Sequence, residues 1–153
     1  MNINYRKATL QDISAMQRLV EPEVESGVIL IRSNNEIATN IRSYMLACFD
    51  GKLAGFVALH IHTPLLAEVR SLIVDNAFHG YKIGSNLIEH ALDEAKTLGL
   101  KEVLSLTYRQ EFFERLGFVE IPKESLPEHK IWADCIKCKH FPVCNEISLI
   151  KTL

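Results

Sequence analysis

The sequence lacks any apolar run long enough to cross a membrane. Nowhere in its 153 residues do about 18 apolar residues follow one another, and the N-terminal stretch MNINYRKATLQD has no apolar core of signal-peptide length. We therefore expect a cytoplasmic protein that makes no membrane contact.

The sequence also has little net charge. Lysine and arginine together number 17 against 19 aspartates and glutamates, so the net charge is −2, and no basic run interleaves with aromatic residues. Nucleic acids and anionic membranes attract clustered positive charge, so neither is an expected partner. The expected partner is a small molecule, and the sequence leaves a homodimer open.

The length of 153 residues and the 48% content of hydrophobic residues fit one domain with a substantial core, over residues 1–153. Segments with alternating apolar residues and segments with helical spacing follow one another, which predicts a mixed α/β class with one parallel βαβ unit. Strands are expected over residues 3–8, 44–49, 53–61, 67–74, 100–106, 118–121 and 146–150. Helices are expected from residue 10 onward and over 34–43, 87–98 and 110–116.

The stretch VRSLIVDNAFHGYKIGSNLIEHAL, residues 69–92, runs from a strand pattern through a glycine-punctuated loop into a helix pattern. The first amides of a helix and its dipole attract phosphate, and His79 and Lys82 add further donors. Taken alone, such a loop is as often only a turn. The stretch contains neither Gly-x-Gly-x-x-Gly nor Gly-Lys-Ser/Thr, which disfavours dinucleotides and nucleoside triphosphates as ligands.

The same loop resembles the acyl-CoA-binding motif of the GCN5-related N-acetyltransferases (GNAT), Gln/Arg-x-x-Gly-x-Gly/Ala, although only Gly84 matches it strictly. FFERLGF, residues 112–118, resembles the aromatic-x-x-x-Gly-Phe ending of that family. The resemblance implies the GNAT fold, an α/β (α+β) fold with a mostly antiparallel sheet, and acetyl-CoA as cosubstrate at the βαβ unit. The residues it implies for acetyl-CoA are Leu72, Ile73, Val74, His79, Gly80, Tyr81, Lys82, Ile83, Gly84 and Ser85.

The chain also resembles the amino-acid N-acetyltransferases of arginine biosynthesis, the N-acetylglutamate synthases. The stretches that carry this resemblance are SGVILIRSNNEIATNIRSYMLACFDGKLAGFVALHI, LAEVRSLIVD, LSLTYRQEFFERLGF and the tail LPEHKIWADCIKCKHFPVCNEISLI. The tail is similar to the ending of their short, single-domain members, which lack the kinase-like domain and its arginine feedback site. The resemblance implies transfer of an acetyl group to the α-amine of L-glutamate. Two alternatives stay open: acetylation of a peptide N-terminus, polyamine or drug, and a non-catalytic acyl-CoA-binding module.

Acetyl transfer to an amine needs a general base, because only the neutral amine attacks. Glu68 stands where the synthases have their catalytic carboxylate. Strict strand alternation would place Glu68, Arg70, Leu72 and Val74 on one face. From the residues alone, an ion pair between Glu68 and Arg70 is the alternative. Tyr108 is the expected general acid, since the family tyrosine is absent, or it is a surface tyrosine packed over a strand end.

The carboxylates of an amino acid are best bound by arginine, because its planar guanidinium donates two parallel hydrogen bonds to one carboxylate. Arg32 matches the substrate-contacting arginine of the synthases, and Arg70 is a second candidate. By itself LIRSN also fits an ordinary solvated arginine. We assign no role to His60 or His62, because scattered histidines are mostly structural.

A cysteine-containing loop is expected over residues 127–146. Cys135, Cys138 and Cys144, with His140 between them, have the ligand types of a structural zinc site. Free cysteines packed as small apolar groups are an equal alternative, and a disulfide is disfavoured in the cytoplasm.

Overall fold

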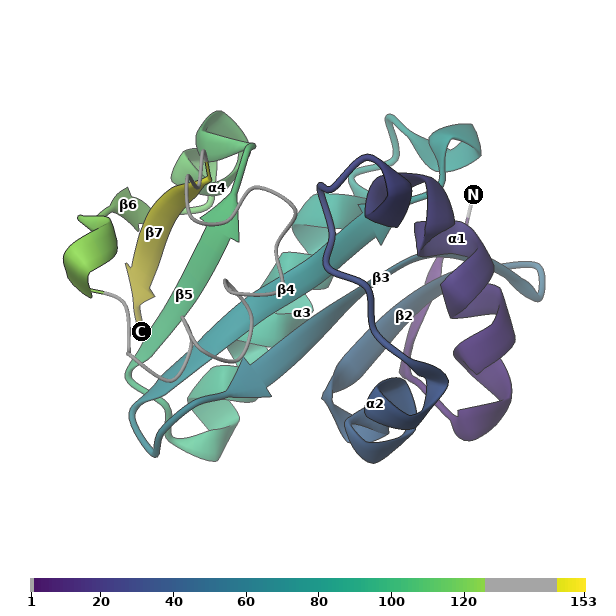
Figure 1. Ribbon diagram of the computed structural model, residues 1–153, viewed down its shortest axis with the longest axis horizontal. Helices are drawn as coiled ribbons and strands as arrows, with labels where there is room; N and C mark the ends of the chain where they lie inside the picture. The colour runs from purple at the N-terminus through teal and green to yellow at the C-terminus, as the bar shows by residue number, and fades with distance from the viewer. Residues whose placement is uncertain (1, 126–145) are drawn as a thin grey trace.

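A seven-stranded sheet forms the centre of the computed structural model, which describes residues 2–125 and 146–153. The strand order is β1-β2-β3-β4-β5-β7-β6 (Figure 1). β4 and β5 pair in parallel, and the other neighbouring strands pair antiparallel. The predicted mixed, mostly antiparallel class is therefore confirmed. The strands are β1 (Asn4–Lys7), β2 (Tyr44–Phe49), β3 (Lys52–Ile61), β4 (Leu66–Val74), β5 (Glu102–Thr107), β6 (Val119–Glu120) and β7 (Ile147–Thr152).

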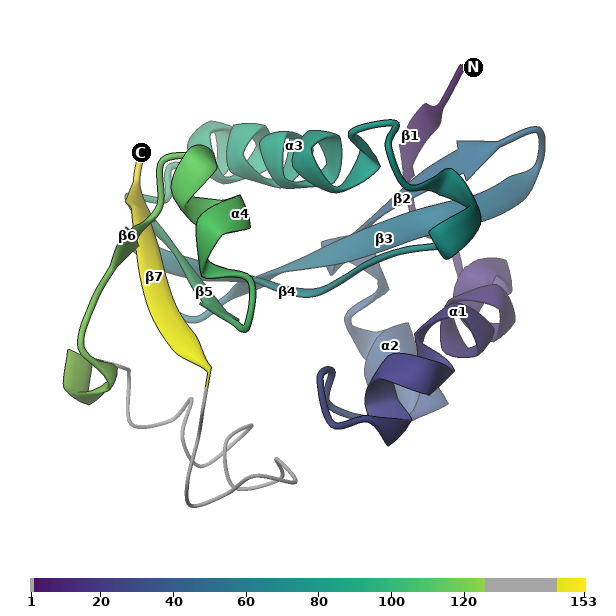
Figure 2. The same ribbon diagram turned by 90° about the horizontal axis from the view of Figure 1, so that it is seen from above.

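Helices cover both faces of this sheet. Figure 2 shows α3 (Ile83–Leu98) and α4 (Gln110–Arg115) on one side, with α1 (Ile13–Glu25) and α2 (Asn34–Thr39) on the other. Helix α3 connects the parallel strands β4 and β5, which confirms the predicted βαβ unit. Short 3-10 turns span Leu10–Asp12, Ile41–Ser43, Asn76–Phe78 and Lys123–Ser125.

Two hydrophobic cores result, one on each face of the sheet. Because side chains alternate along a strand, Val57 and Leu59 of β3 pack beneath α3, whereas Phe56 packs beneath α1. Met16 of α1 and Leu87 of α3 are both fully buried. Burying a large apolar side chain of this kind contributes about 1.5–3 kcal/mol, so each face fixes the helices that cover it.

Local signals in the sequence account for most element boundaries. Thr9 and Asp12 form the predicted capping box before α1. Asp50 and Gly51 both have positive φ angles, 50° and 75°, as the predicted tight hairpin between β2 and β3 requires.

The predicted single helix over residues 34–43 is wrong in one respect. Helix α2 ends at Thr39, and a 3-10 turn follows at Ile41–Ser43. The side chain of Asn40 donates to the carbonyl oxygen of Glu36 at 2.9 Å, so it competes with the backbone for that acceptor and ends the helix.

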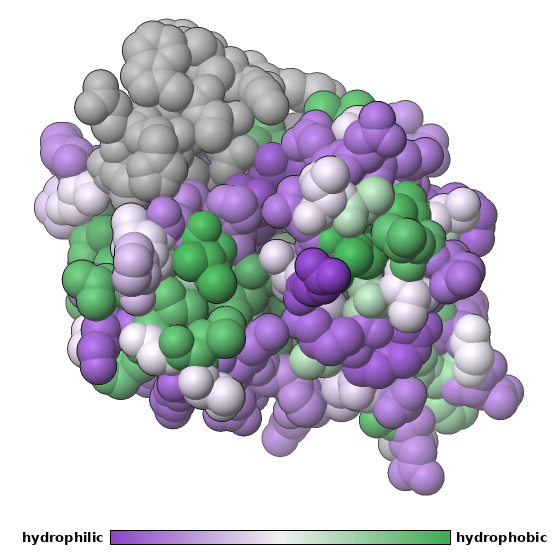
Figure 3. Space-filling view, turned by 90° about the horizontal axis from the view of Figure 1, so that it is seen from below, coloured by the Kyte–Doolittle hydropathy of each residue, from purple (hydrophilic) through white to green (hydrophobic). Residues whose placement is uncertain are grey.

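Exposed apolar side chains are spread over several elements. On the face shown in Figure 3, hydrophobic side chains gather in separate patches that hydrophilic side chains divide. Within residues 2–125 and 146–153, no helix is both long and apolar enough to cross a membrane. The large exposed apolar residues are Leu10, Val28, Ile31, Ile61, Leu65, Tyr81, Leu98, Tyr108 and Val119. The homodimer stays a prediction.

Candidate active site

A cleft opens where the two parallel strands stop pairing. β4 and β5 pair through Leu66–Glu102, Ala67–Val103 and Glu68–Leu104, and then separate. The cavity between them has a volume of about 310 Å³. Its walls come from residues 69–74 of β4 and from residues 105–109 of β5 and the following loop. Glu68 therefore stands at the apex of the split, in the last pair before the strands diverge.

A bulge in β4 changes which side chains face each way. Ser71 has a φ angle of 58°, and the register with β3 shifts between the pairs Ala58–Arg70 and Phe56–Ile73. The extra residue interrupts the alternation of side chains. As a result Leu72 and Val74 pack with the core beneath α3, whereas Ile73 packs with the core beneath α1.

This bulge overturns one prediction. Leu72 and Val74 do not share a face with Glu68 and Arg70, as strict alternation had predicted, because the bulge at Ser71 reverses the alternation. Gly55 of β3 lies against this segment: an added Cβ would stand 2.6 Å from the carbonyl oxygen of Ile73. Glycine is therefore required where β3 passes the bulge.

The start of α3 lies beside the end of β4. A Cβ added at Gly84 would be 3.7 Å from a methyl of Val74 and 3.5 Å from the ring of Phe112 in α4. Lys82 precedes the helix in the left-handed conformation, at φ 59°, and Gly80 has φ 91°. The amides of the first helical turn have no acceptor within the helix, so they face outward as donors.

The predicted acetyl-CoA residues come together only in part. Leu72, Ile73, Val74 and His79 line the cleft, while Gly80–Ser85 follow His79 along the chain into α3. Tyr108 also lines the cleft and is 40% exposed.

Glu68 is held by a histidine that the sequence had not singled out. The Nε2 atom of His62 lies 2.8 Å from Oε1 of Glu68, and their side chains are only 3% and 2% exposed. Arg70, two residues along the same strand, donates from Nη2 to Nδ1 of His60 at 3.1 Å. Among the described residues, no ion pair joins Glu68 to Arg70, so the ion-pair alternative is wrong.

Sequence reasoning missed both histidines because their role depends on strand register. His60 lies directly opposite Glu68 in the β3–β4 pair. The pattern His-x-His before a short turn and Glu-x-Arg after it could have indicated this arrangement, since antiparallel neighbours bring such side chains within reach.

Arg32 lies in a second, smaller cavity next to the cleft. It precedes α2, its side chain is 13% exposed, and its Nη1 lies 3.8 Å from Oε2 of Glu36. Tyr44 and Ser71 line the same cavity, and Ser71 also lines the cleft. Burial raises the pKa of Tyr44 against the opposing charges of Arg32 and Arg70. The positive charges of both guanidinium groups therefore lower the pKa of the same buried phenol, that of Tyr44.

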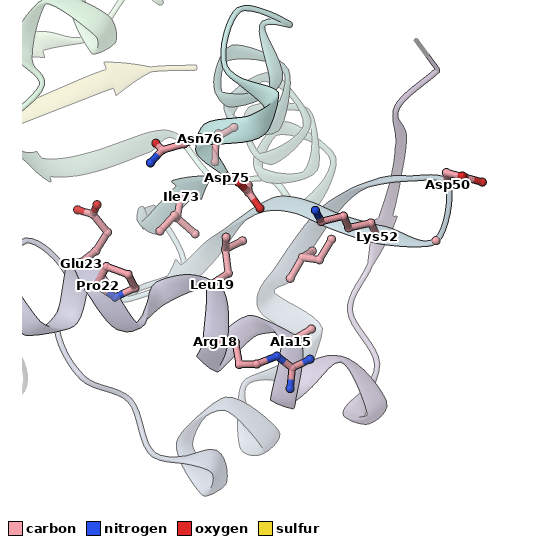
Figure 4. A pocket seen from close by; sticks show the side chains of 13 residues that line it. Ala15, Arg18, Leu19, Pro22, Glu23, Asp50, Lys52, Ile73, Asp75 and Asn76 are labelled. Carbon is pink, nitrogen blue, oxygen red and sulfur yellow. The ribbon is translucent and has the colours of Figure 1, made fainter.

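A wider groove of about 650 Å³ lies between α1, the β2–β3 turn and the end of β4 (Figure 4). Charges of both signs line it, among them Arg18, Lys52 and Asp75. Ile73 and Val74 line this groove as well as the cleft. The end of β4 is therefore a wall common to both.

The predicted metal ligands Cys135, Cys138, His140 and Cys144 lie outside the described residues. In the part of the chain that the structure describes, no group of three or more histidine, cysteine, aspartate or glutamate side chains could hold a metal ion.

Known proteins are similar to this chain in sequence and in fold. An uncharacterized N-acetyltransferase of Chlorobaculum tepidum is 40% identical over 148 residues, which cover 97% of this chain and 95% of the relative. An amino-acid acetyltransferase of Mycobacterium tuberculosis is 34% identical over 120 residues, covering 76% of this chain and 68% of the relative.

Among solved structures, N-acetylglutamate synthase from Neisseria gonorrhoeae complexed with coenzyme A and N-acetyl-glutamate superposes with a TM-score of 0.88 at 25% identity. The match covers all of this chain and 35% of that one. The model of the acetyltransferase (GNAT) family matches residues 10–118, which is more than half of the sequence. The chain therefore belongs to the acetyltransferase (GNAT) family.

Proposed function

We propose that the protein transfers the acetyl group of acetyl-CoA to the α-amine of an amino acid, L-glutamate, the first step of arginine biosynthesis. One observation carries the proposal. A buried carboxylate, Glu68, and an arginine, Arg70, lie side by side at the apex of a cleft between two splayed strands. An acetyltransferase that acts on an amino acid needs two groups: a carboxylate of its own to accept the proton of the amine, and a guanidinium to bind the carboxylate of the substrate.

Acetyl-CoA binds with its pyrophosphate at residues 79–84 and its pantetheine arm along Leu72–Val74. Main-chain amides and the positive end of the α3 dipole attract the phosphates. Beyond Glu68, β4 no longer pairs with β5, so its edge can bond the amides of the pantetheine arm. The solved synthase from Neisseria gonorrhoeae holds coenzyme A, which supports this cosubstrate.

Glu68 acts as the general base through a water molecule. Its side chain is 2% exposed and does not line the cleft, whereas Arg70 does. The α-amine, whose pKa is about 8 or above, must lose a proton before it attacks the thioester carbonyl. That proton passes through the water to Glu68, the new C–N bond forms, and the C–S bond breaks. Tyr108, on the cleft wall, gives its hydroxyl proton to the departing thiolate and is reprotonated by the second proton, which the nitrogen loses as it becomes an amide.

Two arginines suit the two carboxylates of glutamate. Arg70 on the cleft wall holds the α-carboxylate, and Arg32 in the adjoining cavity holds the side-chain carboxylate. Ile29 and the bulge residue Ser71 line both spaces, so the cavity beside Arg32 adjoins the cleft that Arg70 lines.

The test is an acetylation assay with acetyl-CoA and a panel of amino acids, polyamines and peptides, following free thiol and the mass of the product. Glutamate should give the highest kcat/KM. Glu68→Gln should lower kcat about 100-fold with an unchanged KM for acetyl-CoA. Glu89→Gln, an exposed change on α3, is the matched control.

Three outcomes would contradict the proposal. Turnover with polyamines or peptides alone would mean a different acceptor. Coenzyme A binding without turnover would mean a binding module. A Glu68→Gln variant of normal rate would remove Glu68 from the mechanism.

A further inference from the structure

We propose that His60 and His62 are positioning residues that prevent the base and the substrate-binding arginine from pairing with each other. His62 fixes Glu68, and His60 fixes Arg70. The proposal rests on the proposed function, because it assigns the two histidines to separate steps of the same reaction.

The four side chains lie on one face of the β3–β4 pair. His60 is directly opposite Glu68, and His62 follows the end of β3, where its backbone amide donates to the carbonyl oxygen of Leu66 at 2.9 Å. Each histidine bonds the β4 residue two positions beyond the one it faces. Such diagonal neighbours are within reach of long and aromatic side chains. The same offset occurs twice, so the arrangement is a repeated cross-strand contact.

The hydrogen-bond partners fix the tautomer of His60 and place a proton on Nε2 of His62. A guanidinium can only donate, so Nδ1 of His60 must accept, and this ring is neutral with its proton on Nε2. An ionised carboxylate can only accept, so Nε2 of His62 must carry a proton. The ring centroids lie 4.8 Å apart at an interplanar angle of 77°, so the two imidazoles also pack edge to face.

Without the histidines, Glu68 and Arg70 would be two opposite charges at positions i and i+2 of one strand face. A charge-assisted pair between them would be the favoured contact, because such bonds are roughly twice as strong as neutral ones. The guanidinium would then hold the protein's own carboxylate in place of the substrate's. The carboxylate would also become a weaker base, because an adjacent positive charge stabilises its ionised form.

The two histidines should therefore affect different kinetic constants. Loss of the contact to Arg70 should raise the KM for the amino acid, and loss of the contact to Glu68 should lower kcat. A purely structural role would change both constants together through stability. Neither loss should change the KM for acetyl-CoA.

Amide side chains allow a conservative rescue of each bond. The Oδ1 atom of an asparagine can take the place of Nδ1 of histidine as an acceptor, and the Nε2 atom of a glutamine can take the place of Nε2 as a donor. The variants are His60→Asn and His60→Leu, with His62→Gln and His62→Leu. His90→Leu, an exposed position on α3, is the control that should leave all constants unchanged.

His60→Leu should raise the KM for the amino acid about tenfold or more, and His60→Asn should restore it to within about threefold. His62→Leu should lower kcat about tenfold or more, with His62→Gln restoring it. In a protein that already carries Glu68→Gln, the further change His62→Leu should lower kcat only slightly more. Equal effects on both constants, or amide variants no better than leucine variants, would overturn the proposal.

The tautomers give a readout that does not need turnover. Nitrogen NMR of the wild-type protein labelled at histidine nitrogens should show His60 neutral with the proton on Nε2. A protonated Nδ1 on His60 would overturn the proposal even if the acceptor is not an amino acid. Failure of the proposed function would instead appear as wild-type protein that acetylates no amino acid.

Discussion

Gly55→Ala tests whether the bulge in β4 is fixed by a close approach of β3. Gly55 pairs with Val74, next to the pair Phe56–Ile73. An added Cβ would lie 2.6 Å from the carbonyl oxygen of Ile73 and 3.3 Å from Cα of Val74. The first distance is shorter than Cβ atoms show in real structures, and both obstacles are backbone atoms. The two strands would have to move apart, because no flexible side chain can yield.

Inserting one methyl group into packed structure costs about 1–3 kcal/mol, and an obstacle made of backbone favours the upper half of that range. For a chain of this size each kcal/mol lowers Tm by about 2–4 °C, so we expect a fall of about 4–12 °C. Displacement of Ile73 and Val74 would also move the cleft wall. The KM for acetyl-CoA should therefore rise severalfold.

The measurement combines a thermal melt with steady-state kinetics. Gly51→Ala is the control, because Gly51 has φ 75° and open space around its missing Cβ. Gly51→Ala should lower the free energy of unfolding only through backbone strain, by about 1 kcal/mol, and should leave the KM for acetyl-CoA unchanged. If Gly55→Ala melts at the wild-type temperature and binds acetyl-CoA equally well, the close approach does not hold the bulge.

Three further predictions concern the cosubstrate, the acceptor and stability. Gly84→Val should raise the KM for acetyl-CoA about tenfold, whereas Gly84→Ala, whose Cβ would be at the ordinary distance of 3.5 Å from Phe112, should have little effect. If Gly84→Val and the wild-type protein have the same KM for acetyl-CoA, the pyrophosphate does not bind at residues 79–84. Arg32→Lys keeps the charge but loses the fork, so kinetics should show a higher KM for glutamate and an unchanged KM for acetyl-CoA. The hydrogen bonds from Arg6 hold the pKa of Asp12 at about 2, below its ordinary 3.8. The stability that this pair contributes is present above pH 4 and lost as the pH falls toward 2, so Asp12→Asn should remove that part of the acid dependence in denaturant titrations.

Features that depend on neighbouring residues in the chain could be predicted from the sequence. The capping box at Thr9 and the hairpin at Asp50-Gly51 need only two or three residues in the right order. The helix α3 and the strands on either side of it follow from apolar periodicity. Since the order of these elements already constrains the fold, the βαβ unit was predictable as well.

The bulge could not be predicted, because nothing in its sequence marks it. Ser71 adopts a positive φ angle that would ordinarily suggest glycine or asparagine. One extra residue reverses the faces of every side chain that follows it, so the prediction that Leu72 shares a face with Glu68 failed. The pairing of His62 with Glu68 was missed for a different reason, because the His-x-His and Glu-x-Arg pattern indicates it only once the register set by the turn at residues 62–65 is taken into account.

The bulge also explains how one strand can serve two different surfaces. Up to Arg70, β4 directs Glu68 and Arg70 toward the side of the sheet that carries α1 and α2. A regular strand would have placed Leu72 and Val74 on that side too, beside the charged groups, and left the core beneath α3 without them. With the extra residue, both side chains join that core, and β4 still forms the wall of the cleft. The irregularity at Ser71 is therefore what lets Leu72 and Val74 fill the core beneath α3 while Glu68 and Arg70 of the same strand face the other side.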